Sequence, residues 1–289
     1  MIGMIMFGTA LLMLLVGFPV AFIFGGVALW FGVFSEGAEL FAFMPFRIQS
    51  IMENTVLMAV PLFVFMGIVL QKTRLAEQLL ESMGKLFGGV RGGLAISTVL
   101  VGALLAASTG VVGASVVAMG LISLPVMMKY KYNKGLACGT ICASGTLGQI
   151  IPPSIILIIL GDVMGIPVGD LFQAAIGPGM ILIGLYILYI LVFTFLNPEA
   201  APALPMNPDD GTRGQQIFTA LKSIIPPLAL ILVVLGSIFA GIATPTESSA
   251  LGGVGALVLA ILYKQFSWKM VMDAATETVK VTAMVFAIL

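Results

Sequence analysis

Residues 144–155, SGTLGQIIPPSI, place glycines, hydroxyls, an amide and a proline pair inside a run of apolar residues. Proline has no backbone N–H and obstructs the turn before it, so carbonyls of that turn lose their helical hydrogen bonds. Unpaired carbonyls beside hydroxyl side chains are suitable ligands for a small hard cation. We therefore expect the helix over 135–161 to be broken near its middle and to form a cation-binding cradle. The residues of this cradle are Ser144, Gly145, Thr146, Leu147, Gly148, Gln149 and Pro152.

A second polar stretch, AASTGVVGAS at 106–115, lies at the centre of an apolar run over 92–128. Both flanks of this run are basic, so the chain leaves one side of a membrane and returns to it. Two arrangements fit: two short full spans, or a re-entrant helical hairpin whose tip stops near the midplane. Two spans would be joined outside by only ASTG, without a charged or aromatic anchor, which favours the hairpin. Its tip residues Ser108, Thr109 and Gly110 would complete the cradle.

Each of these two features also has a simpler explanation. Proline kinks and small residues serve helix packing in membranes without any ligand. Their occurrence in adjacent segments favours a binding site instead. Two discontinuous elements that meet near the midplane are typical of the ion and substrate site of a secondary transporter.

The stretch ATPTESSA at 243–250 supplies a possible site in a second structural repeat, formed by Thr244, Pro245, Thr246 and Glu247. An ionisable side chain beside an apolar span suggests a role in transport. The same residues also make a helix start, with a threonine cap, an early proline and a carboxylate near the helix N-terminus. Both interpretations remain open at this point.

The composition is that of an integral membrane protein, with 60% hydrophobic and 9% charged residues in 289, where soluble domains carry about 25% charge. The charges balance at 13 against 13, which gives no argument for nucleic-acid binding. Histidine is absent, which excludes most zinc sites and any catalytic pairing of histidine with serine or cysteine. Cys138 and Cys142 lie four residues apart, and we expect them to be buried packing residues.

The remaining apolar runs predict membrane spans, the first of them a single span over 1–35. The segments 71–91 and 129–134 carry seven lysine and arginine residues, whereas 161–172 carries none. The excess of basic residues places the first two segments in the cytoplasm. Leucines at near-helical spacing predict that 71–91 is an amphipathic interfacial helix. The proline-rich loop over 197–216 is expected to be mobile.

A possible inverted repeat relates NTVLMAVPLFVFM at 54–66 to ETVKVTAMVFAIL at 277–289. The five crossings counted between the two starts would invert the second copy, as in inverted-repeat transporters. Because the sequence stops inside this second apolar segment, we expect the chain to be part of a longer protein.

Four motifs resemble a known family, and together they run along essentially the whole chain. They are GFPVAF, AASTGVVGASVVAMG, GTLGQIIPPSI and GIATPTESSA. They are similar to the large membrane subunit, DctM-like, of tripartite ATP-independent periplasmic (TRAP) transporters. The resemblance implies an all-α integral membrane protein with an inverted-repeat, elevator-type fold, a re-entrant hairpin over 92–128 and a broken helix over 135–161.

The division implied by this resemblance has four parts. Residues 1–91 would be scaffold helices with an amphipathic arm helix, and 92–170 part of the transport domain. Residues 171–246 would be connecting transmembrane helices, and 247–289 the incomplete start of the second repeat.

The resemblance also implies sodium-coupled import of organic acids such as dicarboxylates or sialic acid across the bacterial inner membrane. The partners would be a small four-helix membrane subunit and a periplasmic substrate-binding protein, and the coupling ions would be sodium, with no cofactor. Carried over by motif, one sodium ion would be bound by Ser108, Gly145, Leu147, Gly148 and Pro152.

Three alternatives remain for comparison. The first, a passive structural subunit, is disfavoured because a scaffold has no need for paired breaks near the midplane. Elevator carriers for arsenite or dicarboxylates share inverted hairpins but work without a binding protein. An intramembrane aspartyl protease needs two aspartates within the membrane, but Asp162 and Asp170 fall in a predicted outside loop. We therefore expect the protein not to be an enzyme.

Overall fold

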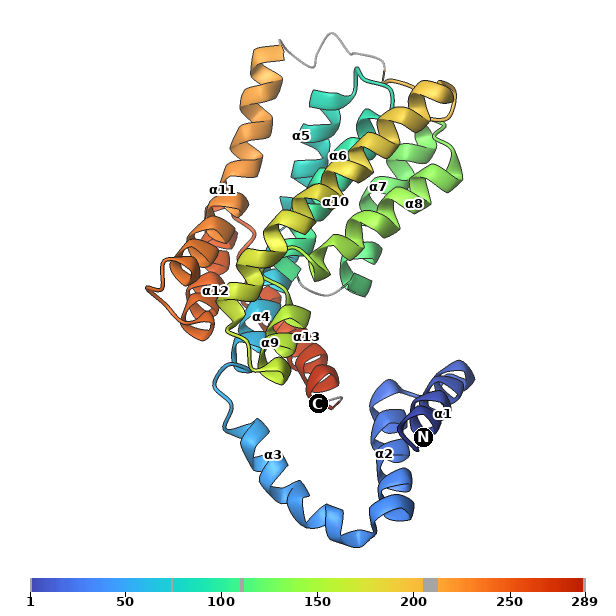
Figure 1. Ribbon diagram of the computed structural model, residues 1–289. Helices are drawn as coiled ribbons and strands as arrows, with labels where there is room; N and C mark the ends of the chain where they lie inside the picture. The colour runs from blue at the N-terminus through green and yellow to red at the C-terminus, as the bar shows by residue number, and fades with distance from the viewer. Residues whose placement is uncertain (1, 74, 110–111, 205–212, 288–289) are drawn as a thin grey trace. The chain divides into compact units, whose positions relative to one another are not determined.

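The computed structural model describes residues 2–73, 75–109, 112–204 and 213–287, and the regular elements in these ranges are all helices (Figure 1). The chain divides into two compact units. One contains residues 1–55 and 277–289, and the other contains 56–276. The four-part functional division expected from the sequence is a separate question and stays a prediction.

The prediction of a single span over 1–35 is wrong, because this run forms two helices. They are α1 (Ile2–Val16) and α2 (Val20–Glu36). Gly17 between them has φ +95°, a left-handed conformation that favours glycine, and Pro19 caps the second helix. The two helices share a small apolar cluster, and η1 (Ala38–Phe43) and α3 (Met44–Met52) follow.

The second unit begins with α4 (Ala59–Lys72) and α5 (Leu75–Phe87). The predicted amphipathic helix is confirmed in α5: Leu79 and Leu80 are buried, whereas Glu81 and Lys85 are exposed. This pattern gives the helix one apolar face for packing and one polar face for a water or headgroup layer.

Two apolar helices follow, α6 (Gly93–Thr109) and α7 (Val112–Lys129), and they pack on each other as a helical hairpin. The predicted break in the next helix is present. The first half, α8 (Lys134–Thr146), leads through a short 3₁₀ turn, η2 (Leu147–Gln149), to α9 (Ile155–Met164).

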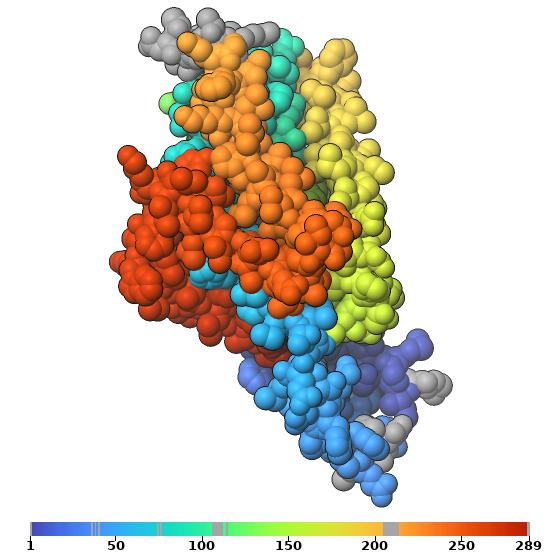
Figure 2. Space-filling model, turned by 90° about the vertical axis from the view of Figure 1, so that its left-hand side faces the viewer, coloured from blue at the N-terminus to red at the C-terminus, as the bar shows by residue number. Residues whose placement is uncertain are grey.

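The remaining helices are α10 (Val168–Leu196), α11 (Arg213–Phe239), α12 (Pro245–Leu262) and α13 (Trp268–Phe286). By length and composition, α10, α11 and α12 are long and apolar enough to cross a membrane, and a fourth span would be counted only if the bent pair α4 and α5 were taken as one span. These apolar helices indicate a multi-pass membrane protein. Figure 2 shows α11 and α12 on one face of this unit, and α12 packs against both α11 and α4.

Helix α6 is the centre of the second unit, since α4, α5, α7, α8 and α10 all contact it. Its buried hydroxyls are satisfied within the helix: Ser97 donates to the Gly93 carbonyl at 2.9 Å and Thr98 to the Leu94 carbonyl at 2.8 Å. Tyr132, in the turn after α7, accepts a hydrogen bond from the Leu94 amide at 3.3 Å. These bonds fix the start of α6 inside an apolar core.

The segment after α10 makes backbone hydrogen bonds to distant turns where the structure describes it, and the expected mobility of this loop stays a prediction. The Gly92 amide donates to the Ala201 carbonyl at 3.1 Å, and the Leu204 amide donates to the Gly88 carbonyl at 2.8 Å. The Asn133 amide donates to the Ala200 carbonyl at 2.7 Å. The segment therefore ties together the turns that precede α6 and α8.

Candidate functional site

The break between α8 and α9 is held by its own hydrogen bonds. The amides of Ile150 and Ile151 both donate to the Leu147 carbonyl, at 3.0 and 2.9 Å. Ser154 then donates from its hydroxyl to the Gln149 carbonyl at 2.7 Å and accepts from the Leu157 amide at 3.5 Å. Ser154 thus closes the break on one side and caps α9 on the other.

Two carbonyls in the break lose their usual helical donors, because residues 152 and 153 are prolines. In a continuous helix these residues would donate to the carbonyls of Gly148 and Gln149. The Gln149 carbonyl receives the Ser154 hydroxyl instead. The Gly148 carbonyl lies in the buried η2 turn and lacks its usual helical donor because residue 152 is proline.

The end of α8 lies between the two arms of the hairpin. At Gly102 of α6, an added Cβ would lie 2.5 Å from the Ser144 Cβ. At Gly145 of α8, an added Cβ would lie 2.3 Å from Val116 Cγ2 and 3.0 Å from the Val116 backbone nitrogen and Cα. Glycine is needed at both positions for the helices to approach this closely. The end of α8, directly before the break, is therefore packed against α6 and α7.

The two predicted hydroxyls of α8 differ in their surroundings. Ser144 is buried and donates to the Ile141 carbonyl at 2.9 Å, whereas Thr146 is exposed and donates to the Ala143 carbonyl at 2.8 Å. A hydroxyl that donates its hydrogen to a carbonyl keeps its oxygen lone pairs for another partner. Both oxygens can therefore still accept from a donor or bind a cation.

The other predicted residues of the cradle are placed as follows. Leu147, Gly148 and Pro152 are buried, and Gln149 is partly buried. Ser108 and Thr109 end α6 in the structure. Their side chains, and all of Gly110, lie outside the described part of the chain. The contact predicted between the hairpin tip and the cradle therefore stays a prediction.

The residues 244–247 form a complete capping box. The Thr244 hydroxyl accepts from the Glu247 amide at 3.3 Å, and the Glu247 carboxylate accepts from the Thr244 amide at 2.8 Å and from its hydroxyl at 2.8 Å. Pro245 is the first residue of α12. The Ser249 hydroxyl donates to the Thr246 carbonyl at 2.7 Å. The helix-start interpretation is thereby confirmed, and any transport role of Glu247 stays a prediction.

Three residues of this region were not expected from the sequence. Ser154 follows two prolines and precedes an apolar run, which is a recognisable cap signal. Gly102 and Val116 have no such local signal, because their importance comes from contacts across helices. A correction also applies to Cys138 and Cys142, which are exposed because they lie on the side of α8 opposite its buried residues.

Comparison with known proteins identifies the family. A family model for the DctM component of the tripartite ATP-independent periplasmic transporter matches residues 7–289. The chain belongs to the DctM family. Members of this family are transporter components and not enzymes.

Curated relatives in the DctM family differ in the substrate that their names give. A C4-dicarboxylate TRAP transporter large permease protein from Vibrio cholerae is 31% identical over 86% of this chain and 53% of its own length. An ectoine permease from Halomonas elongata is 29% identical over 98% of this chain and 65% of its own. A sialic acid permease from Vibrio cholerae is 29% identical over 94% of this chain and 62% of its own length. The chain thus spans about half to two thirds of the length of these relatives.

Proposed function

We propose that this protein forms the membrane-spanning part of a sodium-coupled importer of small organic acids. Support comes from its membership of the DctM family and from the packing of the end of α8, directly before the break, between the arms of the hairpin. The names of its relatives include dicarboxylates and sialic acid, both organic acids.

The sodium ion would be bound chiefly by backbone carbonyls of the break. The residues proposed as ligands are Ser108, Gly145, Leu147, Gly148 and Pro152, with the oxygens of Ser144 and Thr146 nearby. Within the part of the chain that the structure describes, no three acidic or cysteine side chains gather. A cation bound at this place would therefore depend on neutral oxygens, which suit a weakly held and released coupling ion better than a carboxylate cage.

The hairpin would enter the membrane and turn back near its midplane. Such a backbone turn is tolerated there only where protein or a water-filled cavity covers it, and the predicted contact between the hairpin tip and the cradle would supply part of that cover. Because α6, α7 and α8 touch at positions without room for a side chain, they would move as one body in an elevator motion against a scaffold.

Two partners would complete the transporter. A periplasmic substrate-binding protein would deliver the organic acid, and a small four-helix membrane subunit would stand beside this chain. The assembly would lie in the bacterial inner membrane, with the basic turns before α6 and α8 in the cytoplasm.

The experiment that tests this function is sodium-dependent uptake of a labelled organic acid into proteoliposomes. The full-length protein would be reconstituted with its small subunit, and binding protein would be added from outside. Ser108→Ala would be compared with Ser97→Ala, which removes a buried hydroxyl of the same helix that already bonds to Gly93. We expect the first variant to need about tenfold more sodium, since it loses a contact to a charged group, and the second to behave as wild type.

Uptake that needs both sodium and the binding protein would support the proposal. Uptake that is independent of the binding protein would point to a carrier of the arsenite or dicarboxylate type. An identical sodium dependence in Ser108→Ala and Ser97→Ala would refute the assignment of Ser108 to the ion site.

A further inference from the structure

A cavity of about 540 Å³ lies between α5 and α7, apart from the α8–α9 break. Leu121, Ile122 and Pro125 of α7 form an apolar wall, and Leu121 is 74% exposed. The cavity also reaches Leu94, eight residues before Gly102 on α6, which is about 12 Å along a helix axis. The cavity is therefore a feature separate from the candidate ion site.

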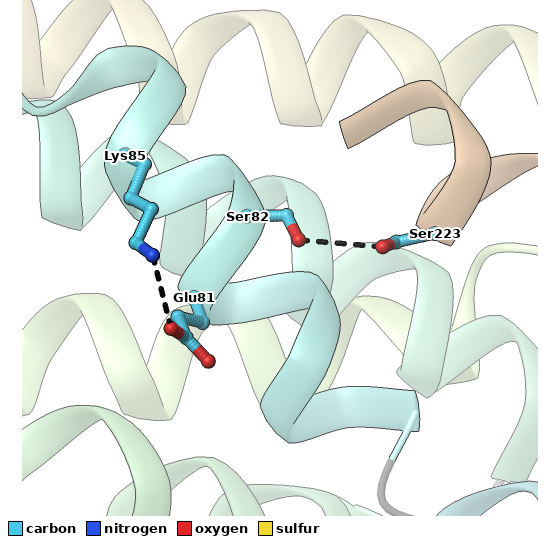
Figure 3. Close-up of polar contacts among 4 residues, drawn as sticks. All are labelled: Glu81, Ser82, Lys85 and Ser223. Carbon is cyan, nitrogen blue, oxygen red and sulfur yellow. Dashed lines mark hydrogen bonds and ion pairs between the residues drawn. The ribbon is translucent and has the colours of Figure 1, made fainter. Parts of the chain in front are cut away.

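The opposite wall carries charges of both signs. Glu77, Glu81 and Lys85 line the cavity and follow one another at intervals of four residues, so they share one face of α5. Lys85 Nζ lies 3.2 Å from the Glu81 carboxylate, as Figure 3 shows. These two side chains are 47% and 67% exposed, so their ion pair is weak and can rearrange around a ligand.

The walls of the cavity are fixed by contacts that do not involve these charges. Ser82 points from another side of α5 toward α11, where its hydroxyl lies 3.3 Å from that of Ser223. Leu204, also in the lining, is held by its amide bond to the Gly88 carbonyl. The helix is thus packed against α11 and α6, and its charged face lines the cavity.

We propose that this cavity binds the headgroup of a zwitterionic phospholipid with a primary ammonium, phosphatidylethanolamine. Lys85 would pair with the phosphate, and Glu77 and Glu81 would pair with the ammonium. Two carboxylates against one lysine disfavour a purely anionic headgroup. The volume is that of a site for a ligand of headgroup size, and the exposed apolar side of α7 at Leu121 would receive the start of an acyl chain.

The chemistry of the neighbouring elements supports this occupant. An amphipathic helix with a charged face and an apolar face lies at the level of lipid headgroups. The apolar wall and the charged wall face the same space, so a ligand that fills it must be polar at one end and apolar at the other. In a membrane protein, phospholipid is the ligand of this kind that is always present.

The test uses a photoactivatable phosphatidylethanolamine that carries a diazirine in its acyl chain. The protein would be reconstituted in vesicles of phosphatidylethanolamine and phosphatidylglycerol, irradiated and digested, and labelled peptides identified by mass spectrometry. We expect label within 121–126, and unlabelled phosphatidylethanolamine should compete about fivefold better than phosphatidylglycerol, as a partly exposed ion pair allows.

Two sets of variants test the charges. Lys85→Gln should reduce labelling about fivefold, whereas Lys134→Gln, an exposed lysine outside the cavity, should leave it unchanged. The double variant Glu77→Gln with Glu81→Gln should let phosphatidylglycerol compete as well as phosphatidylethanolamine. Thermal unfolding of each variant checks that it is folded.

Three results would overturn the proposal. One is the absence of label from 121–126 while other lipid-facing peptides are labelled. Another is equal competition by the two lipids in the wild-type protein, which would mean that the headgroup is not recognised. The third is an equal effect of Lys85→Gln and Lys134→Gln, which would mean that Lys85 acts only through the general surface charge.

Discussion

The contact between Gly145 and Val116 gives a prediction that separates packing from helix propensity. Replacement of Gly139 by alanine places a methyl group where nothing lies within 4 Å. This change should stabilise α8 by about 0.5–1 kcal/mol, since alanine is the better helix former. Replacement of Gly145 by alanine brings the same propensity gain but forces the new Cβ to within 2.3 Å of Val116 Cγ2.

The magnitude follows from the difference between the two variants, in which the propensity gain cancels. Ordinary contact begins at 3.4 Å, so α7 and α8 must separate by about 1 Å at Gly145, and overpacking of this kind costs about 1–3 kcal/mol. Gly145→Ala should therefore be about 1–3 kcal/mol less stable than Gly139→Ala. In a protein of this size the difference corresponds to a midpoint lower by about 5 °C.

The assay is the fraction of purified protein that stays monodisperse after heating in detergent, measured for both variants in parallel. Val116→Ala should recover part of the stability lost in Gly145→Ala, because it removes the Cγ2 atom that meets the new methyl group. Such coupling is expected for residues in direct contact. Equal midpoints for Gly145→Ala and Gly139→Ala would refute the close approach of α7 to the end of α8.

Three further predictions concern single contacts. Glu247→Gln should leave the thermal midpoint at the wild-type value, because glutamine also completes a capping box, while Thr244→Ala should cost about 1 kcal/mol. Equal thermal midpoints for these two variants would contradict the capping geometry. Burial raises the pKa of Tyr132 from 10.0 to about 12, so the folded state holds the phenolic proton more tightly than the unfolded chain. Its contribution to stability should be complete below pH 10 and fall as the pH rises toward 12. The stability of Tyr132→Phe, measured between pH 10 and 12 beside the wild type, should not fall in this way. Parallel curves of stability against pH for the two proteins would argue against the burial of Tyr132. Ser154→Ala should lower the free energy of unfolding by about 1–2 kcal/mol. It should also speed hydrogen exchange at the Leu157 amide, and unchanged exchange there would show that Ser154 does not cap α9.

The break in the α8–α9 segment was predictable because its causes are local. A proline pair removes two backbone donors wherever it lies, and no tertiary contact can restore them. The same holds for the start of α12, where Thr244 and Glu247 cap the helix within four residues of each other. The amphipathic pattern of α5 was also readable, since Leu79 and Lys85 differ in exposure as their spacing requires.

Other features depend on contacts between distant parts of the chain and were not predictable. Nothing in the sequence near Gly102 indicates that Ser144 lies against it. The anchoring of Ala201 and Leu204 to the turns before α6 comes from backbone groups, which leave no trace in residue type. The split of the N-terminal run had a local signal in Gly17 and Pro19, but the apolar character of the whole run concealed it.

The contact between Gly102 and Ser144 has a consequence for how this protein can vary during evolution. The two positions share space for one small side chain, because a Cβ at 102 would lie 2.5 Å from the Ser144 Cβ. A lineage can place alanine or serine at 102 only after 144 has become glycine, and the reverse order passes through a variant with two colliding side chains. Substitutions at the two positions should therefore occur in a fixed order, and the residue at each position limits which residues are tolerated at the other.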